Sequence, residues 1–257
     1  MAAPTSPLAS FDLSDRVAIV TGGSRGIGRA IAEGFAQAGA KVVVASRKAP
    51  ACEEVVRAIE AGGGEALAVP THIGDPEQLQ ALADAAAAAF GGIDVVVNNA
   101  ANALSQPVGS ITPEAFSKSM DVNARGPLLL VQAALPHLRA SEHAAVVDVI
   151  SAGVFTRGEY VAIYLAAKAA LRMLTRSMAA ELAADGVRVN ALAPGTVATD
   201  MTAAVPEEFR QVAIDSQLIK RMADPAELVP AALFLASDAS SFMTGQTLVV
   251  DGGMTAH

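Results

Sequence analysis

The chain has 257 residues and a formal charge of −8 at pH 7. Its length suits one α/β domain with a well-buried core and is short for two. The negative charge, with no run of lysine or arginine, argues against nucleic acid and anionic membranes as partners. We therefore expect small molecules and other subunits as partners.

Cysteine and histidine usage predicts neither a disulfide nor a metal site. Cys52 is the single cysteine, which excludes an intramolecular disulfide and fits a reducing compartment. The four histidines are scattered without the spacing of metal ligands. No apolar run approaches a membrane span, and the first residues lack the features of a signal peptide. We expect a cytoplasmic protein whose residues 1–10 are flexible.

Strand-like and helix-like segments alternate from Arg16 onward. The helices are predicted at 28–39, from about Pro50 to the glycine triplet 62–64, at 76–90, across 112–138, and around Tyr164. The apolar, β-branched strands between them are RVAIVTG, KVVVAS, EALAVP, DVVVNNA, AAVVDVIS, VRVNALAP and TLVVDGG. This alternation predicts a single three-layer α/β domain of the Rossmann type, a seven-stranded parallel sheet with helices on both faces. Residues 196–225 read as a less regular segment able to close over a ligand.

A glycine-rich loop, TGGSRGIG, joins the first strand to the first helix. Gly22, Gly26 and Gly28 in this loop let backbone N–H groups approach a pyrophosphate, and the helix N-terminus favours the anion. A glycine loop alone is weak support, but here a strand precedes it and a helix follows it. The loop predicts a dinucleotide site.

The end of the second strand predicts NADP(H) rather than NAD(H). An NAD site places an acid there to bind the ribose 2′-hydroxyl, whereas this chain has Ser46 and then Arg47. An arginine fork suits a phosphate, and Arg25 in the first loop could reach the same group. The alternative for Arg47 is a solvated charge at a strand end.

Tyr164 and Lys168 are four residues apart, so a helix places them on one face, and Ser151 ends the fifth strand. A neighbouring cation favours the phenolate, so we expect Lys168 to lower the pKa of Tyr164 toward that of a usable general acid. Helices carry such pairs by chance, and Ser151 read alone is a turn serine. The three together with a nucleotide loop favour catalysis.

With these motifs, the chain resembles the short-chain dehydrogenase/reductase family over about residues 11–253. TGGSRGIG is similar to the family's T-G-x3-G-x-G, NNAA to its N-N-A-G, and SSFMTGQTLVVDGG to its C-terminal signature. The resemblance implies a catalytic tetrad of Asn123, Ser151, Tyr164 and Lys168. Tyr164 would protonate the carbonyl oxygen, Ser151 would hold that oxygen, Lys168 would bind the nicotinamide ribose, and Asn123 would hold a water of a proton relay.

The cofactor contacts combine those from the loop with those that the resemblance implies. They are Gly22, Ser24, Arg25, Gly26, Ile27, Gly28, Ser46, Arg47, Lys48, His72, Ile73, Asn99, Ala100, Ala101, Tyr164, Lys168, Pro194, Gly195, Val197 and Thr199. The expected substrate residues are Ser151, Phe155, Tyr160 and Tyr164. Ala101 replaces a family glycine, and His72 stands where the family has an acid or amide beside the adenine.

The expected activity is NADP(H)-dependent reduction of a ketone, aldehyde or 3-oxoacyl substrate, and the reverse oxidation of an alcohol. The variants SRK, HIG and NAA are most similar to the carbonyl reductase branch that includes peroxisomal dehydrogenase/reductase member 4 proteins. The alternatives are a cofactor-binding sensor or scaffold without turnover, and an epimerase or dehydratase on the same fold. The resemblance also implies a homotetramer or a dimer.

Overall fold

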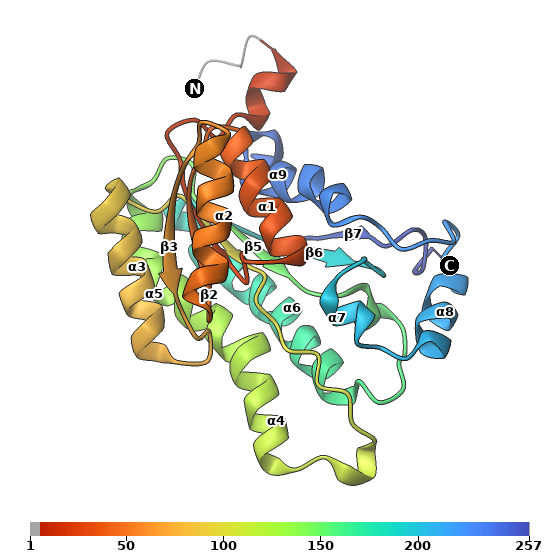
Figure 1. Ribbon diagram of the computed structural model, residues 1–257. Coiled ribbons are helices and arrows are strands. Elements are labelled where there is room, and N and C mark those ends of the chain that lie inside the picture. Colours follow the sequence, from red (N-terminus) through yellow and green to blue (C-terminus); the bar gives the residue numbers. More distant parts are fainter. Residues whose placement is uncertain (1–5, 257) are drawn as a thin grey trace.

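The computed structural model describes residues 6–256. Its centre is a parallel sheet in the order β3-β2-β1-β4-β5-β6-β7 (Figure 1), which confirms the predicted sheet. The strands are short and rich in β-branched residues, and most are buried on both faces, as in a sheet that helices cover on each side. Their bounds are β1 Val17–Thr21, β2 Lys41–Ser46, β3 Glu65–Pro70, β4 Val95–Asn98, β5 Ala145–Val149, β6 Arg188–Pro194 and β7 Thr247–Val250.

Helices cover both faces of the sheet and give the three predicted layers. One core cluster joins α3 (Pro76–Phe90), α5 (Gly126–Ala140) and α6 (Ala162–Leu182) to the strands. A second cluster joins the opposite face to α1 (Gly26–Gln37), α2 (Ala49–Ala61) and α9 (Val229–Ala236). Asp75 caps α3, since its carboxylate accepts from the N–H groups of Glu77 and Gln78.

The helix predicted across 112–138 is interrupted. It divides into α4 (Pro113–Met120), a π-helical turn Asp121–Arg125, and α5. The N–H of Gly126 donates to the carbonyl of Asp121, five residues earlier, and Pro127 has no N–H to continue the α-helical pattern. This turn carries Asn123.

Two flexible or irregular segments were expected. Residues 1–5 lie outside the described residues, and Pro7–Phe11 form a 3-10 helix. Residues 196–225 contain two short helices, α7 (Asp200–Ala203) and α8 (Glu207–Asp215), rather than a loop throughout. None of the helices described is long and apolar enough to cross a membrane.

Candidate active site

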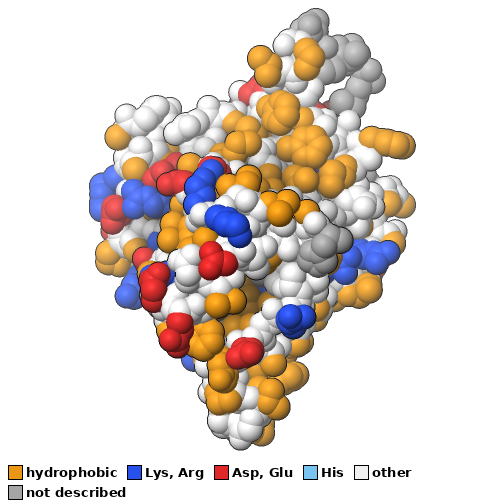
Figure 2. Space-filling model, turned by 90° about the vertical axis from the view of Figure 1, so that its right-hand side faces the viewer, with side chains coloured by type: hydrophobic (Ala, Val, Ile, Leu, Met, Phe, Trp, Pro, Cys, Tyr) orange, Lys and Arg blue, Asp and Glu red, His pale blue; other side chains and the backbone are white. Residues whose placement is uncertain are grey.

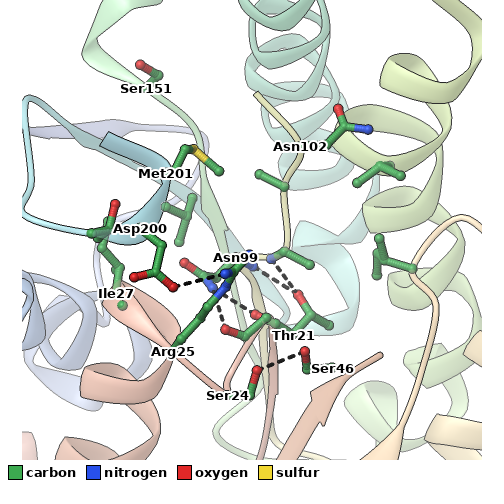
Figure 3. A pocket seen from close by; sticks show the side chains of 18 of the residues that line it. Thr21, Ser24, Arg25, Ile27, Ser46, Asn99, Asn102, Ser151, Asp200 and Met201 are labelled. Carbon is green, nitrogen blue, oxygen red and sulfur yellow. Dashed lines mark hydrogen bonds and ion pairs between the residues drawn. The ribbon is translucent and has the colours of Figure 1, made fainter. Parts of the chain in front are cut away.

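A cavity of about 470 Å³ opens at the carboxyl ends of the strands (Figure 3). It lies where the strand order reverses, between β1 and β4, which is where open parallel sheets bind ligands. Residues that follow β1, β2, β3, β4, β5 and β6 all line it. Ser151 lies at one end of this pocket, and Ser24 and Ser46 lie at the other (Figure 3).

The ends of β1 and β4 are joined by side-chain hydrogen bonds that shape the glycine loop. Thr21 is buried, and its hydroxyl accepts from the N–H groups of Asn99 and Ala100 at 3.0 and 3.1 Å. The amide of Asn99 donates back to the carbonyl of Thr21 at 2.9 Å. Gly22 has φ +64°, and a Cβ there would come within 2.9 Å of the Cα of Ala100. The loop can therefore follow this path only with glycine at position 22.

Gly28, predicted as a cofactor contact, does not line the cavity. It is buried in the first turn of α1, where an added Cβ would overlap the Asn99 amide and the Gly22 carbonyl oxygen. Its role in this structure is close packing of the helix against the loop, which is one of the functions of glycine in such loops.

Gly28→Ala should lower the free energy of unfolding by about 1–3 kcal/mol, because the new methyl overpacks a buried contact. Chemical denaturation measures the change. Gly92→Ala is the matched control, since a Cβ at Gly92 meets nothing within 4 Å. Equal stability of the two variants would contradict the packing role of Gly28.

Hydroxyl and guanidinium groups gather at the end of β2. The hydroxyls of Ser24 and Ser46 are hydrogen-bonded at 2.9 Å, and Arg47 is exposed beside them on the cavity wall. Arg25 pairs with Asp200 at 2.9 Å, with both side chains over two-thirds exposed, so the pair links the glycine loop to the start of α7. Lys48 is exposed and lies outside the cavity lining.

Most of the predicted cofactor contacts are brought together. Besides Gly28 and Lys48, every predicted cofactor contact lines this cavity, including His72, Ile73, Ala101, Pro194, Gly195, Val197 and Thr199. The imidazole of His72 accepts from the N–H of Gly74 at 3.1 Å, which fixes its ring at the cavity wall. Gly26 packs against the side chain of Thr199, so a Cβ there would lie 3.1 Å from the Thr199 methyl.

Ser151, Tyr164 and Lys168 all line the cavity, as the sequence predicts. Ser151 follows β5 and its hydroxyl accepts from the N–H of Gly153 at 3.1 Å. Tyr164 and Lys168 lie on successive turns near the start of α6. Lys168 is almost completely buried, and its ammonium donates to the carbonyl of Val149 at 2.7 Å. The trio thus combines a hydroxyl, a phenol and a cation in one pocket.

The expected lowering of the pKa of Tyr164 is wrong for this structure, because burial outweighs the effect of a neighbouring cation. Burial raises the pKa of Tyr164 to about 12, and the hydroxyl of Ser151 offsets this only in part. The pKa of Lys168 is itself lowered to about 8 by burial, although the charge of Asp148 opposes the change. The phenol is therefore protonated at neutral pH, which suits a proton donor.

Asn123, the fourth member of the predicted tetrad, does not line the cavity. It is fully buried in the π-helical turn, and its amide donates to the side-chain oxygen of Asn102 at 2.9 Å and to the carbonyl of Ser119 at 3.0 Å. Among the described residues, no hydrogen bond joins Asn123 to Lys168. In this structure Asn123 anchors the loop after β4, and its role in a water relay stays a prediction.

Phe155 and Tyr160, predicted to contact substrate, also lie outside the cavity lining. The ring of Phe155 lies 4.7 Å from the guanidinium carbon of Arg172. Tyr160 packs edge to face on Phe209 of α8, with ring centroids 5.8 Å apart. This contact ties the loop before α6 to the segment 196–225.

Sequence reasoning missed several residues that line the cavity. They include Asn102, Leu104, Lys118, Met201 and Thr202, which come from the loop after β4, from α4 and from α7. Asn102 directly continues the NNAA motif, and Met201 and Thr202 follow the predicted contact Thr199, so their positions in the sequence were the available signal. No sequence feature predicted that Lys118 lines the cavity.

Known proteins resemble this chain over nearly its whole length. A family model described as enoyl-(acyl carrier protein) reductase matches residues 22–255. The cis-4-hydroxycyclohexanecarboxylate dehydrogenase of Sinomonas cyclohexanicum is 41% identical, over 95% of this chain and 98% of the relative. Dehydrogenase/reductase SDR family member 4 of Oryctolagus cuniculus is 37% identical, over 94% of each chain.

A solved structure from Beutenbergia cavernae superposes with a TM-score of 0.91 at 39% identity, covering 96% of this chain and 100% of that one. That protein is described as an NAD(P)-dependent gluconate 5-dehydrogenase with NADP bound at low occupancy. The motifs, the strand order and these relatives all indicate the same family. The chain belongs to the short-chain dehydrogenase/reductase family of oxidoreductases.

Proposed function

We propose that this protein is an NADP(H)-dependent oxidoreductase that interconverts a carbonyl compound and the corresponding alcohol. The observation that supports it best is the shared cavity, whose lining includes Ser151, Tyr164 and Lys168 together with the glycine loop. One pocket thus holds a proton donor, a polarising hydroxyl and a nucleotide cradle.

The residues present fit a dinucleotide. The positive φ angles of Gly22 and Gly26 leave backbone where a side chain would otherwise project, and α1 begins at Gly26 with its free N–H groups toward the cavity. Ile73 and Ala100 offer apolar surface for ring systems. The nicotinamide, when bound, supplies or accepts the hydride.

The chain's own residues manage the proton and the carbonyl oxygen. The hydroxyl of Ser151 is placed to hold the oxygen, and the phenol of Tyr164 to protonate it during reduction. The charge on Lys168 favours the phenolate that remains after the transfer. Because the pKa of Tyr164 is raised to about 12, its phenol is protonated at neutral pH and can donate the proton needed for reduction. Alcohol oxidation needs the phenolate, so its rate should increase as the pH rises.

Preference for NADP(H) is supported by the groups at the end of β2. Among the described residues, no acidic side chain lines the cavity at the end of β2, whereas Ser24, Ser46 and Arg47 do. Arg47 has no ion-pair partner among the described residues, so its guanidinium is available to a phosphate.

Arg47→Ala should lower kcat/KM for NADPH by about 10- to 100-fold, the loss expected for hydrogen bonds to a charged group. The value for NADH should stay nearly the same, because NADH lacks the 2′-phosphate. Steady-state kinetics with both cofactors checks the result. Arg57→Ala removes an exposed arginine from α2 outside the cavity lining and serves as the control. A wild-type preference for NADH would contradict the assignment.

The cavity lining is mixed in character, since it includes Leu104 and Met201 as well as Asn102 and Thr202. The outer face of α8 and the segment after it exposes Phe209, Val212, Leu218 and Ile219. Figure 2 shows hydrophobic side chains spread over this side of the molecule. These features support a compact substrate that has both apolar surface and hydroxyl or carbonyl groups. The cyclic hydroxy acid named for the 41% identical relative is of this kind.

A further inference from the structure

A buried carboxylate stands behind the catalytic lysine. Asp148 lies on β5, three residues before Ser151, and is completely inaccessible to solvent. Its two oxygens accept from the amide of Asn98 at 2.8 Å and from the hydroxyl of Thr175 at 2.7 Å. It does not line the cavity, so it cannot contact the substrate. A buried acid of this kind is expensive to retain unless it has a partner.

The fold places this acid beside Lys168. The ammonium of Lys168 is hydrogen-bonded to the carbonyl of Val149, the residue next to Asp148. Thr175, which holds the carboxylate, lies on the same buried stripe of α6 as Lys168, seven residues and about two turns further on. The same strand and helix therefore carry both charged groups, and both side chains are buried.

The hydrogen-bond network around Asp148 suits the anion. Asn98 and Thr175 both act as donors, and an ionised carboxylate is an acceptor only. The amide of Asn98 also donates to the carbonyl of Pro127, and its side-chain oxygen is buried with no hydrogen-bond partner among the described residues. A buried oxygen without a partner costs stability, so the orientation of Asn98 favours holding the carboxylate.

Few other charges reach this pair. Asp148 is paired in register with Ala191 on β6, and with Asn98 on β4. The titratable groups of α6 are Tyr164, Lys168, Arg172, Arg176 and Glu181, and of these Lys168 alone is buried. Among the described residues, Lys168 is thus the cation that faces Asp148, and Asp148 is the anion that faces Lys168.

We propose that Asp148 is a positioning residue of this active site, whose buried carboxylate keeps the ammonium of Lys168 charged beside Tyr164. Asn98 and Thr175 orient the carboxylate, and β5 carries it to the same strand end as Ser151. The inference rests on the proposed reaction for its consequence, but the coupling of the two charges exists without turnover.

The test is the titration of Lys168 in the purified full-length protein. Lysine labelled with ¹³C at the ε-carbon gives NMR signals for Lys41, Lys48, Lys118, Lys168 and Lys220, and a Lys168→Met variant assigns the signal of interest. The pKa of Lys168, about 8 in this structure, should fall by about one unit or more in Asp148→Asn, because an opposite charge has been removed.

Two further variants sharpen the result. Thr175→Val keeps the charge but removes one donor, so it should shift the titration in the same direction by a smaller amount. Asp94→Asn is the matched control: it removes an acid from the amino-terminal end of β4, where the carboxylate accepts from the N–H of Val17. It should leave the titration of Lys168 unchanged.

The pH profile gives a second readout. In Asp148→Asn, the alkaline limb of kcat for reduction should move down by the same amount, and a shift of about one unit costs about fivefold in rate at pH 8 and little at pH 6. An unchanged Lys168 titration in folded Asp148→Asn would overturn the proposal. A shifted titration in a protein without oxidoreductase activity would instead overturn the proposed function and leave the coupling intact.

Discussion

Tyr164→Phe should lower kcat for carbonyl reduction by about 10²- to 10⁴-fold, because it removes the proton donor while leaving the ring in place. The free energy of unfolding should change little, since the phenyl ring keeps its packing. Affinity for NADPH should be nearly unchanged, as the glycine loop and the groups at the end of β2 are untouched. Steady-state kinetics and a binding titration measure these quantities.

Tyr160→Phe is the matched control for this experiment. It makes the same chemical change four residues earlier, at a ring that packs on Phe209 outside the cavity lining. It should retain most of the wild-type rate. Equal rates for the Tyr164→Phe variant and the wild type would remove Tyr164 from the reaction.

The double variant Asp148→Asn, Lys168→Met should be more stable than the wild type by about 1–4 kcal/mol at neutral pH, and nearly inactive. Burial removes both charges from water, and their mutual attraction does not fully offset this desolvation free energy. Replacing both at once leaves no lone buried charge. Chemical denaturation and the rate of NADPH oxidation, measured on the same samples, check both parts of the prediction.

The advantage of the double variant should depend on pH in a defined way. Burial raises the pKa of Asp148 from 3.8 to about 6, so its anion destabilises the fold increasingly as pH rises through that interval. Burial lowers the pKa of Lys168 from 10.5 to about 8, so its cation destabilises the fold until pH rises through that second interval. The advantage should be greatest between about pH 6 and 8.

A control pair isolates burial as the cause. Lys48 and Asp84 are both exposed, so Lys48→Met with Asp84→Asn makes the same two types of substitution at the surface, removing one positive and one negative charge. That pair should change the free energy of unfolding by less than about 0.5 kcal/mol. If the buried double variant were instead markedly less stable than the wild type, the two buried charges would be stabilising the fold rather than serving the site.

The sheet and the centre of the site could be predicted because their causes are local. Apolar β-branched runs form buried strands whatever surrounds them, and the glycines of TGGSRGIG are needed by the path of one loop. Ser151 follows β5, and Tyr164 and Lys168 lie on α6, the next long helix along the chain. One strand–helix connection therefore brings the three residues together.

What could not be predicted depends on packing between distant segments. The π-helical turn that buries Asn123 against Asn102 requires the loop after β4, and the sequence of α4 and α5 alone reads as one helix. Tyr160 points to α8 rather than to the cavity because Phe209 is there to receive it. Burial, which raises the pKa of Tyr164, is a property of the whole core.

The role of Asp148 could not be predicted from the sequence either. In the sequence it is one polar residue within a buried strand, and nothing in AAVVDVIS predicts that Lys168 lies beside it. The structure adds the orientation of α6 across β5, which turns a core residue into a neighbour of the catalytic site.

The most direct test of the central claim follows the hydride itself. Wild-type protein is incubated with NADPH in which both hydrogens at C4 of the nicotinamide are replaced by deuterium. Cyclic ketones, keto acids and a 3-oxoacyl thioester are tested in turn as substrates. Mass spectrometry of the products should show one deuterium on the carbinol carbon of the alcohol formed, with the label absent from products of the Tyr164→Phe variant on the same timescale. Product with an unchanged oxidation state and no label, or tight NADPH binding without any product, would contradict the account.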